Sequence, residues 1–260
     1  MILIVGKNSN LSKNLSEKLD NCVLISSSVI ENNLESLLSY CTEDSIDIVL
    51  NNFQASTLLN DNSDFDNYII KSILNTSKIL TFLIKNNIKI NNLIYTSSSS
   101  VYGNNELCSE NNSVKPMSLQ GALKVSAEEL IKRFCSEHKI NYTITRIFNM
   151  YGGDDKFSVI GKIKNAYLEN EILNIINDGK SIRDYIHIDD VVKVYQCLLE
   201  NYSANPKLLN IASGSGISIK EILTFLENKE IVIHKNNIFR KEINVSIADI
   251  ILLNKIIDTE

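Results

Sequence analysis

The sequence predicts an α/β protein built on a doubly wound parallel sheet. Short apolar runs alternate along the chain with longer amphipathic segments, and these runs are apolar at nearly every position. Strands of that kind are typical of a parallel sheet covered by helices on both faces. The length of 260 residues, 44% of them apolar, suits one such domain with a small appended lobe.

Taken in order, the apolar runs predict strands and the amphipathic segments predict helices. The predicted strands are Ile2–Val5, Cys22–Ile25, Ile46–Leu50, Leu93–Ser97, Tyr142–Ile147 and Leu208–Ile211. The predicted helices cover residues 9–19, 31–42, 67–86, 119–138, 158–168, 188–201 and 218–227. Beyond residue 152, further segments have strand character: Ile172–Ile176, Ser181–Ile188 and Ile231–His234.

The second half of the chain departs from strict alternation. We expect residues 1–152, joined by residues 182–202, to form the sheet domain, and residues 153–181 and 203–260 to form a small C-terminal lobe. In open α/β sheets, ligands bind outside the carboxyl ends of the strands. A lobe at that edge is therefore expected to bind the substrate.

Composition excludes several classes of function. A net charge of −5 gives no basic surface for nucleic acid. The five cysteines are scattered and form no C-x-x-C pair, which argues against a disulfide framework or a metal site and for a reducing cytoplasm. No apolar run approaches the roughly 20 residues of a membrane helix. We expect a cytoplasmic protein with no metal, nucleic acid or membrane partner.

The first predicted strand leads into the loop Gly6-Lys-Asn-Ser-Asn-Leu-Ser12 and then a helix. Backbone N–H groups and the positive end of a helix bind pyrophosphate in such loops. Of the three small positions in the dinucleotide fingerprint, only the first is glycine, because serine occupies the other two. An ordinary strand–turn–helix start explains the pattern equally well. The candidate cofactor-binding residues here are Gly6, Ser9, Asn10 and Leu11.

The second predicted strand ends in Ile25-Ser-Ser-Ser28 and has no acidic residue at its tip. An acid at this position binds the adenosine ribose hydroxyls of NAD and repels the 2′-phosphate of NADP. Its absence favours NADP slightly over NAD, and Ser26 becomes a further cofactor-binding candidate.

Five motifs then follow in order. They are YTSSSSVYG (95–103), PMSLQGALK (116–124), RIFNMYG (146–152), DGKSIRDYIHIDD (178–190) and LNIASG (209–214). In this order and spacing they resemble the extended short-chain dehydrogenase/reductase family, the NAD-dependent epimerases and dehydratases that modify nucleotide sugars. The resemblance covers residues 1 to about 228. It implies a Rossmann-type fold, NADP or NAD as cofactor and a nucleoside-diphosphate sugar as substrate.

The resemblance also implies catalytic roles. A hydroxyl, here Ser98, hydrogen-bonds the reacting sugar oxygen, and a tyrosinate moves its proton. Lys124 binds the nicotinamide ribose and lowers the pKa of that tyrosine. However, Gln120 stands at the tyrosine position, and an amide can only donate and accept hydrogen bonds. Either Tyr102 or a desolvated Lys124 moves the proton, or water relays it, or no such chemistry occurs. Packing is the favoured role of Tyr102.

A second departure from the family follows the third predicted strand. The family places two small alanines where the chain passes the cofactor, whereas this chain has Phe53 and Gln54. Bulky side chains there would crowd a dinucleotide. Both remain candidate cofactor-binding residues by position, and together with the two loop serines they favour a degenerate enzyme.

The substrate-binding motifs are better kept. The resemblance implies that Asn149 contacts the sugar or diphosphate and that Arg183 clamps the diphosphate, since a guanidinium fork matches phosphate oxygens. The alternative for Arg183 is an ion pair with Asp184 or Asp190. Ser99 is a third substrate-binding candidate.

The remaining polar residues of these motifs favour structural roles. We expect His187 to be structural, and the Asp189-Asp190 pair to cap the helix that follows it. The 4,6-dehydratases place an Asp-Glu pair after the catalytic hydroxyl, where this chain has Ser99-Ser100. Dehydration is therefore less favoured than oxidoreduction or epimerisation.

Three hypotheses remain at this stage. The leading one is an NAD(P)-dependent nucleotide-sugar oxidoreductase or epimerase, of the 4-keto-sugar reductase or C4 dehydrogenase/epimerase type, in bacterial surface-polysaccharide biosynthesis. The alternative is a pseudoenzyme that binds a nucleotide sugar or dinucleotide and partners an active paralogue. In the third, the helices at 67–86 and 119–138 serve interaction; by the resemblance this pair forms a homodimer.

Overall fold

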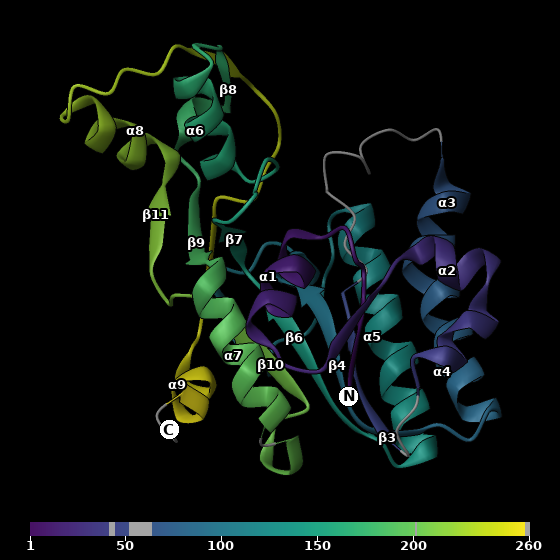
Figure 1. Cartoon of the computed structure of the whole chain (residues 1–260). Coiled ribbons are helices and arrows are strands. Elements are labelled where there is room, and N and C mark those ends of the chain that lie inside the picture. The colour runs from purple at the N-terminus through teal and green to yellow at the C-terminus, as the bar shows by residue number, and fades with distance from the viewer. Residues whose placement is uncertain (42–44, 52–63, 201, 258–260) are drawn as a thin grey trace.

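The computed structural model describes residues 1–41, 45–51, 64–200 and 202–257, and its main layer is a six-stranded, wholly parallel sheet (Figure 1). The strands are β1 (Ile2–Val5), β2 (Cys22–Ile25), β3 (Ser45–Leu50), β4 (Lys89–Ser98), β6 (Asn141–Ile147) and β10 (Leu208–Ile211). They lie in the order β10-β6-β4-β3-β1-β2. The predicted doubly wound α/β class is therefore confirmed.

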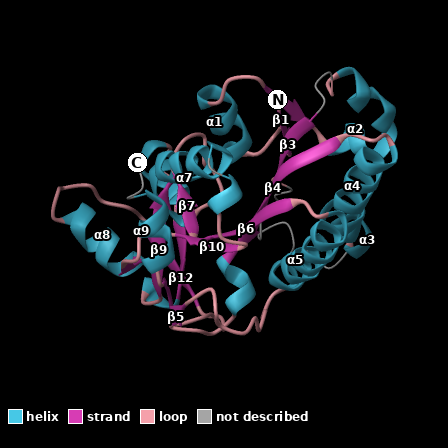
Figure 2. Ribbon diagram, turned by 90° about the horizontal axis from the view of Figure 1, so that it is seen from below, coloured by secondary structure: helices cyan, strands magenta, loops and turns pink. Residues whose placement is uncertain are grey.

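Helices cover both faces of this sheet (Figure 2). One face carries α1 (Asn10–Lys18), α7 (Ile188–Glu200) and α9 (Ile251–Ile257), and the other carries α2 (Ser27–Asn32), α4 (Asn75–Lys85) and α5 (Leu119–His138). Successive residues of β1 alternate between the two cores: Leu3 and Val5 pack with the α4 and α5 side, and Ile4 packs with the α1 and α7 side. This two-sided burial is why β1 is apolar at every position.

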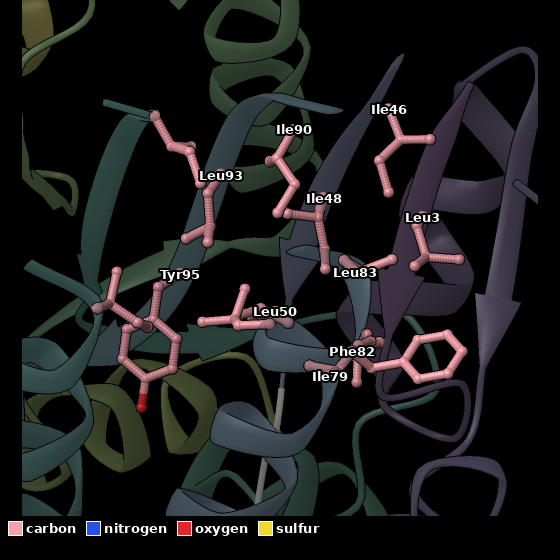
Figure 3. Packing of buried hydrophobic residues seen from close by; sticks show 14 of the residues in the cluster. Leu3, Ile46, Ile48, Leu50, Ile79, Phe82, Leu83, Ile90, Leu93 and Tyr95 are labelled. Atoms are coloured by element: carbon pink, nitrogen blue, oxygen red, sulfur yellow. The ribbon is translucent and has the colours of Figure 1, made fainter. Parts of the chain in front are cut away.

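The core on the α4 side is closely filled (Figure 3). Ile48, Leu50 and Leu93 from the central strands meet Ile79 and Leu83 from α4, and all five are fully buried. Burying an aliphatic side chain of this size contributes roughly 1.5–3 kcal/mol. Packing against α4 thus stabilises one face of the sheet that carries the candidate site.

A second group of elements lies beyond the main sheet, with part of it at the upper left of Figure 1. Its five-stranded sheet has the order β11-β9-β13-β5, with β7 paired to β9, and a separate ladder joins β12 to β8. The strands are β5 (Leu107–Cys108), β7 (Asn149–Tyr151), β8 (Leu173–Ile176), β9 (Ile182–His187), β11 (Gly216–Ser218), β12 (Lys235–Ile238) and β13 (Val245–Ala248). Two helices, α6 (Val159–Leu168) and α8 (Ile219–Glu227), share an apolar cluster with β8.

Two predicted helices differ from the structure. The helix predicted at 31–42 is instead α2 followed by a 3₁₀ turn over Leu34–Ser39, because the backbone of Asn33 between them is not helical (φ −152°, ψ 59°). The helix predicted at 67–86 begins earlier, as α3 (Phe65–Ile69), and reaches α4 through a π-helical turn over Ile70–Leu74.

The strand predicted at Ile231–His234 is wrong. Ile233 is buried in the cluster between α6 and α8, so its apolar character reflects packing and not strand pairing. Pairing with β8 begins only at the His234 carbonyl, which accepts from the Leu173 N–H (2.8 Å), and continues through the polar strand β12. Within the described residues, every helix is too short or too polar to cross a lipid bilayer.

Candidate active site

The winding direction of the main sheet reverses between β1 and β3, and the ligand crevice of such sheets opens at the carboxyl ends of the strands there. Gly6 directly follows β1 and has a backbone φ of +105°, which residues other than glycine rarely adopt. A Cβ at this position would overlap the carbonyl oxygen of Asn51, which directly follows β3. The glycine is therefore required for the two strand ends to approach.

Serines occupy the other two fingerprint positions and bond to one another and to Asn51. The Asn51 side chain, only 1% exposed, donates to the hydroxyls of Ser9 (2.6 Å) and Ser12 (2.9 Å). Ser9 also caps α1 by accepting from the Ser12 N–H (3.0 Å). The two hydroxyls thus have partners inside the protein, and the loop keeps its shape without the extra glycines. The contribution of Asn51 could have been suspected only from its place after a buried strand.

The other loop candidates have different surroundings. Leu11 is buried in the core beside α7, so only its backbone faces the loop. Asn10 donates to the Gly152 carbonyl (2.8 Å) and accepts from the Asp154 N–H (3.0 Å), which ties the start of α1 to the loop after β7. Ser26 is half-buried at the start of α2, with its hydroxyl 2.7 Å from that of Ser28. Phe53 and Gln54 lie outside the described residues.

The catalytic candidates come from β4 and α5. Ser98 is the last residue of β4, and its hydroxyl accepts from the N–H of Ser100 (3.2 Å). α5 begins after Ser118, which caps it by accepting from the Gly121 N–H (3.1 Å). A Cβ on Gly121 would lie 2.7 Å from the Ser100 carbonyl oxygen, so glycine lets the helix approach the turn after β4. The half-buried Gln120 is thereby brought next to the segment that holds Ser98 and Ser99.

Lys124 lies one helical turn further into the protein and is only 7% exposed. Its ammonium donates to the Thr96 carbonyl (2.6 Å) and lies 4.9 Å from the ring centre of Tyr95. Burial lowers the pKa of Lys124 to about 8, and the nearby Glu128 carboxylate partly opposes this. A lysine with such a pKa exists in both protonation states near neutrality.

Tyr102 is unsuited to proton transfer. It is fully buried, and its hydroxyl donates to the Asn210 side chain (2.6 Å) while the Arg146 guanidinium lies 4.7 Å from its ring centre. Burial raises the pKa of Tyr102 to about 12. The packing role favoured from the sequence agrees with these contacts.

The two implied substrate ligands lie on paired strands, Asn149 at the start of β7 and Arg183 within β9. Asn149 donates to the Asp184 carbonyl (2.8 Å). Arg183 pairs with Glu242 (3.3 Å), and its guanidinium also donates to the Ile243 carbonyl. The sequence alternative of an ion pair with Asp184 or Asp190 is therefore wrong.

These two aspartates are engaged elsewhere. Asp184 is fully buried and accepts from the backbone N–H groups of Ser213, Gly214 and Ala248, whereas Asp190 lies in the first turn of α7 beside Lys193. No sequence pattern pointed to Glu242, because it lies in an irregular segment far along the chain.

The remaining features of this region are a histidine in a packing role and a cavity. His187 packs on Gly152, where a Cβ would overlap its ring, and contacts Asp189 (3.4 Å). A cavity of about 430 Å³ opens between the segments 177–182 and 239–245. Among the described residues, no group of three or more His, Cys, Asp or Glu side chains is arranged to hold a metal ion.

The profile of the NAD dependent epimerase/dehydratase family matches residues 6–212, which is most of the chain. The chain belongs to this family. The match runs from the glycine after β1 to the end of β10, so it includes the loop, the β4 edge and α5.

Several family relatives and solved structures are similar to the chain. The dTDP-4-dehydro-6-deoxyglucose reductase of Escherichia coli is 32% identical over 167 residues, 61% of this chain and 52% of that protein. Protein CapI of Staphylococcus aureus is 28% identical over 62% of this chain and 54% of that protein. The chain spans about half the length of the curated relatives it matches. The UDP-glucuronic acid 4-epimerase from Bacillus cereus, solved with UDP-glucuronic acid and NAD, has a TM-score of 0.84 at 22% identity. The structural alignment covers all of this chain and 93% of the epimerase chain.

Proposed function

We propose that this chain is an NAD(P)-dependent oxidoreductase or epimerase of nucleotide sugars, of the 4-keto-sugar reductase or C4 dehydrogenase/epimerase type. The observation that carries the proposal is the buried ammonium of Lys124, held beneath the carboxyl end of β4 where Ser98 ends the strand. A desolvated cation at that edge suits a site that binds a dinucleotide ribose and handles a proton. The family assignment supports the same chemistry.

The residues present fit a nicotinamide dinucleotide. Gly6 keeps the positive φ that such a loop needs, and α1 begins directly after the loop. Because the Asn51 amide holds the hydroxyls of Ser9 and Ser12, these two side chains need no ligand partner. The loop would hold the pyrophosphate and Lys124 the nicotinamide ribose. When bound, the dinucleotide supplies an acceptor or donor of hydride.

We assign the proton to Lys124, since Gln120 is an amide with no usable pKa. In the oxidising direction, the neutral amine of Lys124 takes the proton of the sugar hydroxyl, and a bound dinucleotide would supply the hydride acceptor. In the reducing direction, the ammonium of Lys124 returns that proton, and a bound reduced dinucleotide would supply the hydride. Ser98 and the Gln120 amide hydrogen-bond the sugar oxygen, and Arg183 with Asn149 holds the diphosphate end. For Arg183 this requires a change of partner, because Glu242 pairs with it now.

We expect the pH profile of turnover to report Lys124. Oxidation needs the neutral amine, so its kcat/KM is expected to rise through about pH 8, whereas reduction needs the ammonium and is expected to fall through the same value. Rates of both directions, measured across this range with a nucleotide-sugar panel, test the proposal. Lys124→Arg keeps a permanent charge and should remove the titration. A wild-type profile without a midpoint near pH 8 would exclude Lys124 as the proton carrier.

A second candidate function is a non-catalytic binder of nucleotide sugar or dinucleotide that partners an active paralogue. Gln120 at the tyrosine position favours it. The discriminating experiment measures the excess 260 nm absorbance of the purified protein, and then turnover of the wild type beside Gln120→Tyr. Bound nucleotide with turnover only in Gln120→Tyr supports the binder. Turnover in the wild type that Gln120→Tyr does not increase supports the enzyme.

The wider context rests on the family and the relatives. We propose a cytoplasmic role in making surface-polysaccharide sugars. We also propose that the segments 153–181 and 203–260 supply the substrate-binding lobe, apart from β10 and α9, which belong to the main sheet and its helix layer. The absence of an acid at Ser26 favours NADP. We also propose a homodimer through the helical segments 67–86 and 119–138. The exposed apolar side chains of Phe65, Ile69 and Leu74, around the start of the first segment, support this.

A further inference from the structure

A buried ion pair lies beneath the candidate site and takes no part in the chemistry proposed above. Glu128 of α5 and Arg146 of β6 have side chains that are 1% and 3% exposed. The guanidinium binds both carboxylate oxygens, with Nη2–Oε2 at 2.7 Å and Nε–Oε1 at 3.1 Å. This two-point geometry fixes the carboxylate in one orientation.

The carboxylate contacts the elements that carry both catalytic candidates. Glu128 follows Lys124 by one turn of α5, and residues four apart lie on the same helix face. It also accepts a short hydrogen bond (2.5 Å) from the hydroxyl of Ser97, the residue before Ser98. Gln120, Lys124 and Glu128 therefore form one polar stripe that runs inward along α5.

Stability alone does not account for this stripe. Taking two charges out of water costs several kcal/mol for each ion, and replacing buried ion pairs by apolar residues is often neutral or stabilising. An ordinary helix–sheet contact at this depth is apolar, as it is between α4 and the sheet. The pair is thus better explained by what its charge and its hydrogen bonds do to the neighbouring site.

We propose that Glu128 is a positioning residue: its carboxylate fixes Ser97, and with it the strand end that carries Ser98, and supplies negative charge beside the ammonium of Lys124. The inference rests on the proposed function for its catalytic meaning, but the charge coupling itself needs no ligand. Burial opposes the ammonium form of Lys124, and the carboxylate favours it. Without Glu128, the amine would be neutral over a wider pH range.

Other charged or titratable groups lie on the elements packed against α5, and the experiment has to separate them from Glu128. In the described residues these are Lys89 and Tyr95 on β4, Tyr102 in the turn after β4, Tyr142 and Arg146 on β6, and Lys71 in the π-helical turn before α4. Only Glu128 contributes a formal negative charge among these groups. Its replacement should therefore move the titration of Lys124 toward lower pH, not higher.

The test is a direct titration of Lys124 in the full-length protein. We would label the lysines with ¹³C at Cε and assign the Lys124 signal by its loss in Lys124→Arg. In Glu128→Gln we expect the midpoint to fall by about one pH unit, because the carboxylate on the next turn of α5 raises the pKa of Lys124. Glu129→Gln is the matched control: it is the next residue on α5, exposed and paired with Lys132, and should leave the midpoint unchanged. An unchanged midpoint in Glu128→Gln would overturn the proposal, whether or not the protein turns over substrate.

Glu128→Gln leaves the buried charge of Arg146 without its ion-pair partner and could fold poorly for that reason. Two further variants test the proposal in that case. The double variant Glu128→Met/Arg146→Met removes both charges and should still lower the midpoint. Ser97→Ala leaves the charges in place, so it should keep the midpoint and lower kcat several-fold with little change in KM. Full kcat in Ser97→Ala would refute the positioning of Ser98. Failure of the wild type to turn over any nucleotide sugar counts against the proposed function alone.

Discussion

Replacing Lys124 by methionine is expected to lower kcat/KM for the preferred nucleotide sugar by about 100-fold or more, while leaving the protein folded. A positioned proton carrier contributes roughly 10²–10⁴-fold to a rate. Methionine has a similar length and no charge, so it can fill the same buried channel between α5 and β4. The expected loss thus isolates the ammonium from the packing of its stem.

The same Lys124→Met substitution, which lowers activity, is not expected to lower stability. Because the folded protein holds the pKa of Lys124 near 8, below that of an exposed lysine, folding is disfavoured at neutral pH by on the order of 3 kcal/mol. This penalty is present below about pH 8 and disappears as the pH rises past the pKa of an unfolded lysine. Methionine removes the penalty but also the hydrogen bond to Thr96, worth about 1–3 kcal/mol. We therefore expect a thermal midpoint at or slightly above that of the wild type.

Lys132→Met provides the matched control, because Lys132 lies on the same helix, is more exposed and pairs with Glu129. Both kcat/KM and the thermal midpoint should stay close to the wild-type values. Unfolding of Lys124→Met at neutral pH would show that the ammonium is a structural element of the core. A folded Lys124→Met with full activity would remove the proposed site.

The sequence predicted the main sheet closely because a strand buried on two faces is a continuous apolar run. β1 and β2 have the predicted bounds, since each is a short apolar run with polar residues on both sides. Where a strand is buried on one face only or is polar, the sequence shows no such run. β12 consists of Lys-Asn-Asn-Ile, and its pairing is visible only from its neighbour β8. The apolar Ile233 before it misled the prediction because its side chain packs against helices.

The same distinction holds for the candidate site. The family resemblance placed Ser98, Gln120 and Lys124 in one site, and the four-residue spacing of the last two placed them on one face of a helix. Partners supplied by distant segments had no such signal. Asn51 binds serines 42 and 39 positions earlier, and Glu242 pairs with Arg183 across 59 positions. Such contacts follow from tertiary packing, which a local pattern does not encode.

Replacing Gly6 by alanine is expected to lower the free energy of unfolding by about 3 kcal/mol or more. A φ of +105° costs a residue with a Cβ roughly 1–3 kcal/mol, and forcing atoms into a filled space costs a similar amount. The added methyl group would overlap the Asn51 carbonyl, so the ends of β1 and β3 would have to separate. For a chain of this length the thermal midpoint should fall by roughly 10 °C.

The loss should extend to ligand binding, because the same displacement would move Asn51 away from Ser9 and Ser12 and distort the start of α1. We expect dinucleotide affinity, measured by fluorescence titration below the lowered midpoint, to fall together with stability. Lys7→Ala changes the neighbouring exposed side chain without altering this backbone, and should leave the thermal midpoint unchanged. If Gly6→Ala kept wild-type stability and affinity, the close approach of the two strand ends would not be what shapes the loop. The serine cluster would then need no glycine beside it.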